Sequence, residues 1–234
     1  MTVELHFVVS CEHGGNRIPA RYGQLFRGFA GLLHSHRGYD IGALRMAREL
    51  AAMLAAPLFA ATTSRLLIDL NRSMGHPNLY SEATRDVPAA VRREILERYH
   101  TPYRNNVEKS ISEAIRAGQR VIHISSHSFT PELNGQIRNT DIGLLYDPPR
   151  PFERDFCNRW RANLRAHAPG FAVRRNYPYA GRANGLTSYL RRRYPANAYV
   201  GIELEINQKH VLKGGQKWRE LRNSVIGALP RTVG

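Results

Sequence analysis

Two histidines, His13 and His127, each come at the end of an apolar stretch that we expect to form an inner strand. Gly14 and Gly15 follow His13 and let the backbone bend tightly. Serines flank His127 in what we expect to be a loop. Neutral imidazoles at fixed strand ends are suitable ligands for Zn²⁺, whose catalytic sites use three protein ligands and leave a position for water. One such histidine alone is usually a hydrogen-bonded loop residue, but the pair favours a metal site.

A second polar stretch, Asp69-Leu70-Asn71-Arg72, ends a short apolar run that we expect to be a strand. The planar fork of Arg72 matches a carboxylate at two points, and Asn71 adds a neutral donor beside it. These two residues could therefore receive a free carboxylate or a carbonyl oxygen. An ion pair between Arg72 and a structural acid fits the local sequence equally well.

A third group is acidic. Glu203 and Glu205 lie on one face of an otherwise apolar strand at residues 198–206. Burial of a carboxylate is costly unless it is paired, protonated or next to a cation. Beside a metal, one of the two could act as general base for water and then as general acid to a leaving amine. The alternative is an ion pair with an arginine. Catalysis is favoured for one of them, and Glu205 is the preferred candidate.

The net charge of +15 is the strongest feature of the composition. Clustered cations bind nucleic acids because they release counterions from the phosphate backbone. Here 30 of the 34 basic residues are arginines scattered along the chain, and no DNA- or RNA-binding motif accompanies them. We therefore expect no nucleic-acid partner, and a positive field that attracts small anionic substrates.

The sequence also indicates a compartment. No stretch approaches the ~20 apolar residues of a membrane span, and the first residues lack the pattern of a secretory signal. We expect a cytoplasmic protein with no membrane partner, in which Cys11 and Cys157 stay reduced. Cys11 stands beside Glu12 and His13 and could be a nucleophile, but a buried, inert thiol is the commoner case.

The elements that must position these groups alternate along the chain. Apolar patterns predict strands at 3–10, 65–70, 120–126, 142–146 and 198–206, and helices at 39–55, 88–117, 152–167, 184–193 and 215–229. The long helix at 88–117 has a potential break near Thr101-Pro102. This order predicts one α/β domain over residues 1–234, with a mixed, mostly parallel sheet and helices on both faces. Functional groups are then expected beyond the carboxyl ends of the strands.

In this order, the motifs resemble the zinc carboxypeptidase and aspartoacylase superfamily. The N-formylglutamate amidohydrolase family is more closely similar, in the stretches SCEHGGNRIP, SRLLIDLNRS, HISSHSFTP, RNTDIGLLYDP and NYPYAGR. The resemblance spans most of the chain. It implies a phosphorylase/hydrolase-like fold and cleavage of the amide between a small acyl group and an amino acid.

The resemblance also implies roles for individual residues. His13 and His127 would ligate zinc, and Asn71-Arg72 would hold the substrate carboxylate. Glu205 would match the catalytic glutamate, because Glu-Ile-Asn-Gln stands where the family has Glu-x-x-Gln. The later stretch NYPYAGR resembles a substrate-binding segment, with Tyr177, Tyr179 and Arg182.

One position departs from the carboxypeptidase pattern. A glutamate three residues after the first histidine supplies the third zinc ligand there, and Asn16 occupies that position here. An amide is a poor zinc ligand, so another residue must replace it. Asp40, at a predicted helix start, is the preferred candidate, and Glu12 is the second.

These observations give a working hypothesis. Zinc held by His13, Asp40 and His127 activates water for attack on a formyl or acyl carbonyl, and Glu205 moves the proton. Arg72 and Arg138 fix the carboxylates of a small acidic acyl-amino acid; Arg138 is included because a lid loop could carry it to the substrate. Two alternatives remain open: a non-catalytic binding protein for a small acidic ligand, and a zinc peptidase acting on short or cell-wall peptides.

Overall fold

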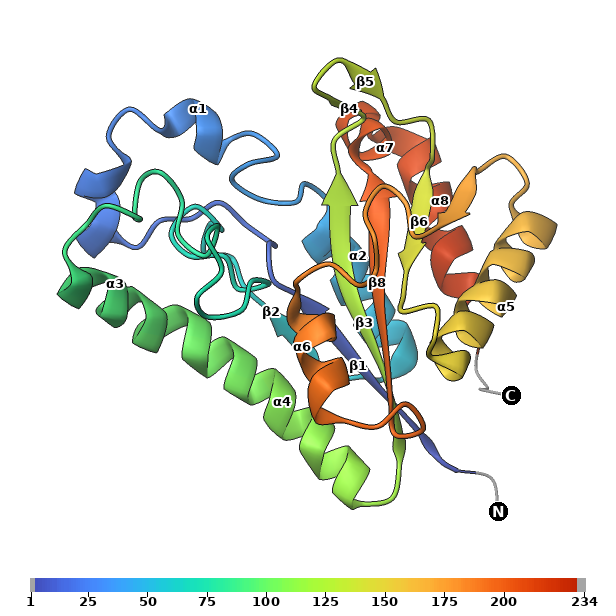
Figure 1. Ribbon diagram of the computed structural model, residues 1–234. Helices are drawn as coiled ribbons and strands as arrows, with labels where there is room; N and C mark the ends of the chain where they lie inside the picture. Colours follow the sequence, from blue (N-terminus) through green and yellow to red (C-terminus); the bar gives the residue numbers. More distant parts are fainter. Residues whose placement is uncertain (1–2, 231–234) are drawn as a thin grey trace.

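The computed structural model describes residues 3–230, which are built around a six-stranded sheet (Figure 1). The strands follow the spatial order β2-β1-β3-β8-β6-β7. Their bounds are β1 Leu5–Cys11, β2 Leu58–Ala60, β3 Arg120–Phe129, β6 Ile142–Leu145, β7 Val173–Arg175 and β8 Tyr199–Asn207. Neighbouring strands are parallel except for β6 and β8. The predicted α/β class with a mixed, mostly parallel sheet is confirmed.

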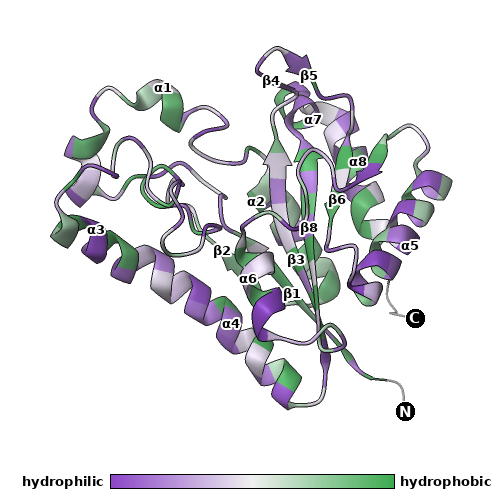
Figure 2. Ribbon diagram, in the orientation of Figure 1, coloured by the Kyte–Doolittle hydropathy of each residue, from purple (hydrophilic) through white to green (hydrophobic). Residues whose placement is uncertain are grey.

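Helices cover both faces of this sheet (Figure 1). One face is covered by α2 (Ala43–Leu54), α5 (Pro151–His167) and α8 (Gly215–Gly227), and the other by α4 (Thr101–Arg116) and α6 (Leu186–Arg193). Each long helix has apolar and polar residues in alternating patches, as expected for a helix that buries one stripe (Figure 2). The remaining elements are short: η1 Ala20–Phe26, α1 Ala30–Leu33, α3 Ala89–Ile95, η2 Leu96–His100, β4 Glu132–Leu133, β5 Gln136–Ile137 and α7 Gln208–Lys213.

The two faces of the three central strands differ in polarity. Toward α2, α5 and α8 the strands present mainly apolar side chains, and the exceptions are Ser126 and Ser128 at the end of β3, which donate to the carbonyls of Ala43 and Ile41. Toward α4 and α6 only the first part is apolar, with Val8, Val121 and Tyr199 in one cluster. The same face continues in polar residues: Ser10, Glu12, His123, Ser125, His127, Glu203 and Glu205. Because side chains alternate along a strand and these strands run in parallel, the polar halves meet at one end of the sheet.

Strand β3 is longer than the sequence predicted. It continues to Phe129, so His127 lies inside the strand and not in the loop that was expected to carry it. The register of β3 with β8 places His127 opposite Glu205 and Ser125 opposite Glu203. His123 lies deeper and is hydrogen-bonded to Tyr199 and Ser10, at 2.8 Å each. Both ring nitrogens of His123 are therefore occupied inside the protein.

The strand predicted at 65–70 was wrong. These residues form turns and irregular backbone, and their apolar side chains pack with Tyr22, Phe26, Leu79 and Ile95 in a cluster beside the sheet. A short, continuous apolar run indicates burial, but it does not distinguish a strand from a packed loop. The strand in this part of the chain is β2, only three residues long, which pairs with β1.

The long helical stretch after Pro88 continues through its predicted break. A π-helical turn at Leu96–His100 separates α3 from α4, and the N–H of Thr101 bonds to the carbonyl of Leu96, five residues back. Pro102 has no N–H to donate, so the usual bond to residue 98 is missing there. The wider turn accommodates this loss without ending the helix.

Gly143 on β6 provides a test of how tightly this sheet is covered. A Cβ at this position would lie 2.0 Å from the carbonyl oxygen of Tyr177 and 3.1 Å from the Cβ of Glu205. Gly143→Ala should therefore destabilise the fold by about 2 kcal/mol or more, which corresponds to a decrease in Tm of roughly 4–8 °C. Gly227→Ala is the matched control, because nothing lies within 4 Å of its Cβ. Equal Tm values for the two variants would contradict this packing.

Candidate metal centre and its cavity

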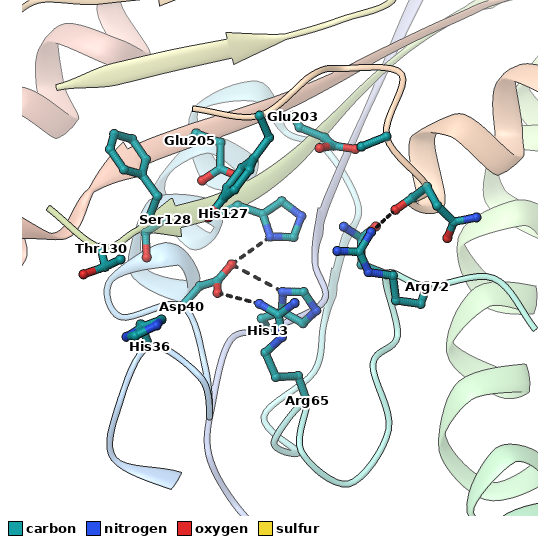
Figure 3. A pocket seen from close by; sticks show the side chains of 15 residues that line it. His13, His36, Asp40, Arg65, Arg72, His127, Ser128, Thr130, Glu203 and Glu205 are labelled. Carbon is teal, nitrogen blue, oxygen red and sulfur yellow. Dashed lines mark hydrogen bonds and ion pairs between the residues drawn. The ribbon is translucent and has the colours of Figure 1, made fainter. Parts of the chain in front are cut away.

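The polar end of the sheet opens into a cavity of about 200 Å³. Residues from six separate stretches line it: His13, His36, Asp40, Arg65, Asn71, Arg72, His127, Ser128, Phe129, Thr130, Tyr179, Ala183, Asn184, Glu203 and Glu205. Figure 3 shows these side chains converging from the two central strands and from the loops around them. The cavity thus contains the three groups of residues that the sequence singled out.

His13, Asp40 and His127 form a cluster that could hold a metal ion. All three side chains are buried, and their ligand atoms lie within 4.8 Å of one another. The Oδ2 atom of Asp40 lies 3.3 Å from Nδ1 of His13 and 2.8 Å from Nδ1 of His127 (Figure 3). The loop before α2 carries Asp40, whose backbone N–H bonds to the carbonyl of His13.

The spacing of these donor atoms fits a tetrahedral zinc site. Bonds of 2.0–2.1 Å to a tetrahedral ion place neighbouring ligand atoms about 3.3 Å apart. The distance from Asp40 Oδ2 to Nδ1 of His13, 3.3 Å, already has this value. The distance from Asp40 Oδ2 to Nδ1 of His127, 2.8 Å, is 0.5 Å shorter. Two imidazoles and one carboxylate are also a common ligand set for catalytic zinc.

The second nitrogen of each histidine is held by a carboxylate. Nε2 of His13 lies 2.7 Å from Asp69, and Nε2 of His127 lies 3.1 Å from Glu12 and 2.9 Å from Ser125. Glu12 also accepts hydrogen bonds from the Ser125 and Tyr103 hydroxyls. A carboxylate behind a histidine fixes the ring and directs its other nitrogen toward a metal. Glu12, the second candidate for the third ligand, is therefore behind His127 and outside the three-residue cluster.

The charges in this cluster shift the pKa values of its members. Burial opposes the charge on His127, but the hydrogen bonds that its ring donates to the carboxylates of Asp40 and Glu12 outweigh burial and hold the pKa of His127 well above its usual range. Burial likewise disfavours ionised Asp40 and Glu12, yet the two histidines lower the pKa of Asp40 and His127 lowers that of Glu12. Without a metal, a proton on His127 therefore compensates these carboxylates.

Arg65 connects the carboxylate of Asp40, in the metal-binding cluster, with that of Asp69, behind His13, a role that the sequence did not indicate. Its guanidinium lies 3.4 Å from Asp40 Oδ1 and 2.8 Å from Asp69 Oδ2. Burial disfavours the charge of Arg65, but Asp69 and Asp40 raise its pKa further above the usual value. Arg65 thus holds the oxygen of each carboxylate that does not contact a histidine. The only sequence signal was the position of Arg65 four residues before Asp69, which allows an ion pair.

Glu205 differs from these acids because no hydrogen bond or ion pair joins its side chain to the other described residues. It is 5 % exposed, and its Oε2 atom has no hydrogen-bond partner among the described residues. Burial raises the pKa of Glu205 to about 8, with Asp40 and Glu203 adding to the shift. Glu203, the alternative base, lines the same cavity but accepts a hydrogen bond of 2.6 Å from Thr187.

Arg72 reaches the cavity from the irregular loop that follows Asp69. Its Nη1 donates to the backbone oxygen of Asn184 (Figure 3), and its Nε lies 3.9 Å from Asp69 and has no hydrogen-bond partner among the described residues. The backbone oxygen of Arg72 accepts bonds from His100 and Arg104, which hold this part of the loop against the helices. Free donor capacity thus remains for a ligand in the cavity.

Asn71 lies beside it in the cavity lining, but its side-chain oxygen accepts the N–H of Leu186 at 2.7 Å. Asn71 therefore connects the loop to the start of α6, and its amide nitrogen is the group left for a ligand.

The structure separates the remaining predicted substrate residues. Tyr179 lines the cavity. Arg138 is not among the lining residues, but it contacts two of them: its Nη1 donates to the Tyr179 hydroxyl at 3.2 Å, and its guanidinium lies over the ring of Phe129. Arg182 is outside the cavity: it is ion-paired with Asp147 at 2.7 Å and borders another depression. Tyr177 does not line the cavity either, and its ring packs edge-to-face against Phe129.

Cys11 points away from this site. It lies in the apolar cluster on the α2 face of the sheet, opposite Glu12, and burial raises the pKa of its thiol well above the usual value. The interpretation of Cys11 as an inert, buried thiol agrees with this environment. Within residues 3–230, no helix is long and apolar enough to cross a membrane.

The chain is similar to several known proteins. The sequence profile of N-formylglutamate amidohydrolase matches residues 5–212. A solved structure of a gene product from Agrobacterium tumefaciens superposes with a TM-score of 0.79 and 28% identity, over 97% of this chain and 91% of that chain. N-formylglutamate amidohydrolase from Ralstonia eutropha superposes with a TM-score of 0.69 and 18% identity, with coverage of 97% and 91%. No match is found among curated proteins.

The profile match covers most of the chain and includes all the residues of the candidate site. The resemblance that the motif order indicated is thus confirmed over its whole predicted span. The chain belongs to the N-formylglutamate amidohydrolase family, and it is a hydrolase that acts on amide bonds.

Proposed function

We propose that this protein is a zinc-dependent amidohydrolase that cleaves the amide of an N-formyl- or other small N-acyl-amino acid with an acidic side chain. One observation carries the proposal: the cavity combines a cluster of metal-binding donors with an unpartnered, buried carboxyl group and an arginine with free donors. The donors are His13, Asp40 and His127, the carboxyl group is that of Glu205, and the arginine is Arg72. Family membership supports the reaction class.

His13, Asp40 and His127 would hold the metal. A bound Zn²⁺ supplies a Lewis acid that polarises a carbonyl oxygen and lowers the pKa of water. Asp69 and Glu12 keep the two imidazoles in place from behind, and Arg65 holds the Asp40 carboxylate in its orientation. Asn16 does not weaken this assignment, because Asp40 offers the carboxylate oxygen that an amide could not supply well.

Glu205 is the residue that we assign as proton carrier. Its carboxyl group lies in the cavity next to His127 in the adjacent strand, and none of the described residues holds Oε2. A general base must accept a proton from water and then return it, so a carboxyl group without a fixed partner suits the role better than one bound by Thr187. Its pKa of about 8 means that Glu205 holds a proton at neutral pH in the metal-free chain. A cation bound beside it would lower that pKa and leave the carboxylate free to act as the base. Glu205 takes the proton from the attacking water and passes it to the leaving nitrogen.

Arg72 would bind the carboxylate of the amino acid with its free Nε–H and with Nη2, which lies on the same edge of the guanidinium, while Nη1 stays bonded to Asn184. A charge-assisted, two-point contact favours this arrangement. Tyr179 lines the cavity and is bonded to Arg138, and the two would meet a second carboxylate on the substrate side chain. The small volume of the cavity, about 200 Å³, favours a single acyl-amino acid over a long peptide.

The first prediction concerns the metal. The purified protein should contain, or take up, one Zn²⁺ per chain, and His127→Ala and Asp40→Ala should each lose it, because a catalytic zinc needs all three protein ligands. Elemental analysis after dialysis measures this directly. His34→Ala is the matched control, because His34 is exposed and bonds only to the carbonyl of Ala30. Full zinc content in either cluster variant would refute the metal assignment.

The second prediction separates the two glutamates. Glu205→Gln should keep zinc and lose activity by about 10²–10⁴-fold in kcat, the range typical of a general base. Glu203→Gln removes a charge from the same strand and cavity, but the amide can still accept the Thr187 hydrogen bond, so kcat should fall by less than about tenfold. Hydrolysis of N-formyl- and N-acetylglutamate measures both. The reverse order of effects would move the catalytic role to Glu203.

The third prediction uses the stability of the metal-free protein. The pKa of Glu205 is about 8 in the folded chain, compared with an ordinary 4.5. The folded state therefore holds this proton more tightly, so the stabilisation is complete below pH 4.5 and is lost as the pH rises toward 8. Gln cannot ionise, so the Tm of Glu205→Gln should exceed that of the wild type by a margin that grows between pH 5 and 8.5, to several degrees. A margin independent of pH would contradict the raised pKa.

A further inference from the structure

A second depression of about 280 Å³ lies between α6 and the start of α5. It is lined by Asp147, Arg150, Arg182, Ser188, Arg191 and Arg192. The loop at residues 181–185 separates it from the metal cavity: Arg182 borders this depression, whereas Ala183 and Asn184 line the metal cavity. We call this depression the arginine cavity.

Positive charge exceeds negative charge around the arginine cavity. Four arginines line it, and two carboxylates pair with them: Asp147 with Arg182 at 2.7 Å, and Glu153 with Arg191 at 3.0 Å. Four cations against two anions leave an excess of two. Arg192 accounts for part of this excess, because it is exposed and no hydrogen bond or ion pair joins it to the rest of residues 3–230.

Arg150 supplies the second, independent observation. This residue is only 9 % exposed, and its Nη1 atom has no hydrogen-bond partner among the described residues. The nearest carboxylate oxygen, on Glu153, is 3.8 Å away, and Nη2 is occupied by the carbonyl of Tyr194. A buried donor without an acceptor costs about 1–3 kcal/mol. An acceptor entering the cavity would remove this cost.

The chemistry of the cavity selects a small oxyanion. Arginine forks bind phosphate and carboxylate oxygens at two points, and an excess of two positive charges balances a dianion. The positive end of α5, which begins at Pro151, adds to the same field. We propose that the arginine cavity is a phosphate-binding site, distinct from the metal cavity, in which Arg150, Arg182 and Arg192 contact the bound group.

Titration of the metal-free, full-length protein with inorganic phosphate tests the site. Wild type should bind about one phosphate in calorimetry, and Arg192→Gln and Arg182→Gln should each weaken binding at least about tenfold, equivalent to 1.4 kcal/mol. Arg193→Gln is the matched control, because the neighbouring Arg193 pairs with Glu108 and does not line the cavity. Glycerol phosphate, compared with free phosphate, shows whether the cavity also takes a phosphoryl group on a larger molecule.

Two further measurements make the result decisive. Arg72→Gln should bind phosphate as the wild type does, since Arg72 belongs to the metal cavity. Phosphate should also slow hydrogen exchange in the backbone at residues 181–192, which form one wall of the site. Wild-type affinity in Arg192→Gln, or loss of binding in Arg72→Gln, would overturn the proposal. None of these readouts depends on amide hydrolysis, so they remain informative whatever the substrate of the enzyme is.

Discussion

The shared carboxylate of Asp40 is the interaction on which the rest of the site depends. One oxygen contacts both histidines, and the other contacts Arg65. Three segments far apart in sequence are thereby fixed at one point: the end of β1, the loop before α2, and β3. Since like charges and unpaired donors would be costly in this buried place, each neighbour needs its own partner. Asp69 is the partner of His13, and Glu12 is the partner of His127. The network ends at the hydroxyl groups of Ser125 and Tyr103, which donate to Glu12.

The register of the sheet provides the second constraint. Alternation along β1, β3 and β8 sends every second side chain to the α4 face, and a shift of one residue in any strand would move its polar set into the apolar core. The pairing of His127 with Glu205 is thus a consequence of where β8 aligns with β3. Apolar residues at the start of the strands hold this alignment, and the polar residues at the end depend on it.

Much of this could be predicted from the sequence, and the failures have a physical pattern. The fold class follows from the periodicity of the segments, and His13 and His127 stand at the ends of apolar runs that indicate strands. Arg65 and the stretch after it were misassigned, because four buried apolar residues pack equally well in a loop. The role of Arg182 was transferred from a motif, and its ion pair with Asp147 depends on a contact across 35 residues that local patterns do not contain. Contacts between irregular segments are what the sequence leaves undetermined.

The contrast between Asp40 and Glu205 indicates where the function lies. Both are buried carboxyl groups beside His127, yet their surroundings move their pKa values in opposite directions. Asp40 is surrounded by donors and stays ionised, as a ligand must. Glu205 lacks such donors and retains its proton up to about pH 8 in the metal-free chain. Opposite shifts in neighbouring acids are what our proposed roles require, an ionised metal ligand at Asp40 and a proton carrier at Glu205. A buried carboxyl group without a hydrogen-bond partner destabilises the fold. Glu203 has such a partner in Thr187, whereas none of the described residues bonds to Oε2 of Glu205, so stability alone does not explain the surroundings of Glu205.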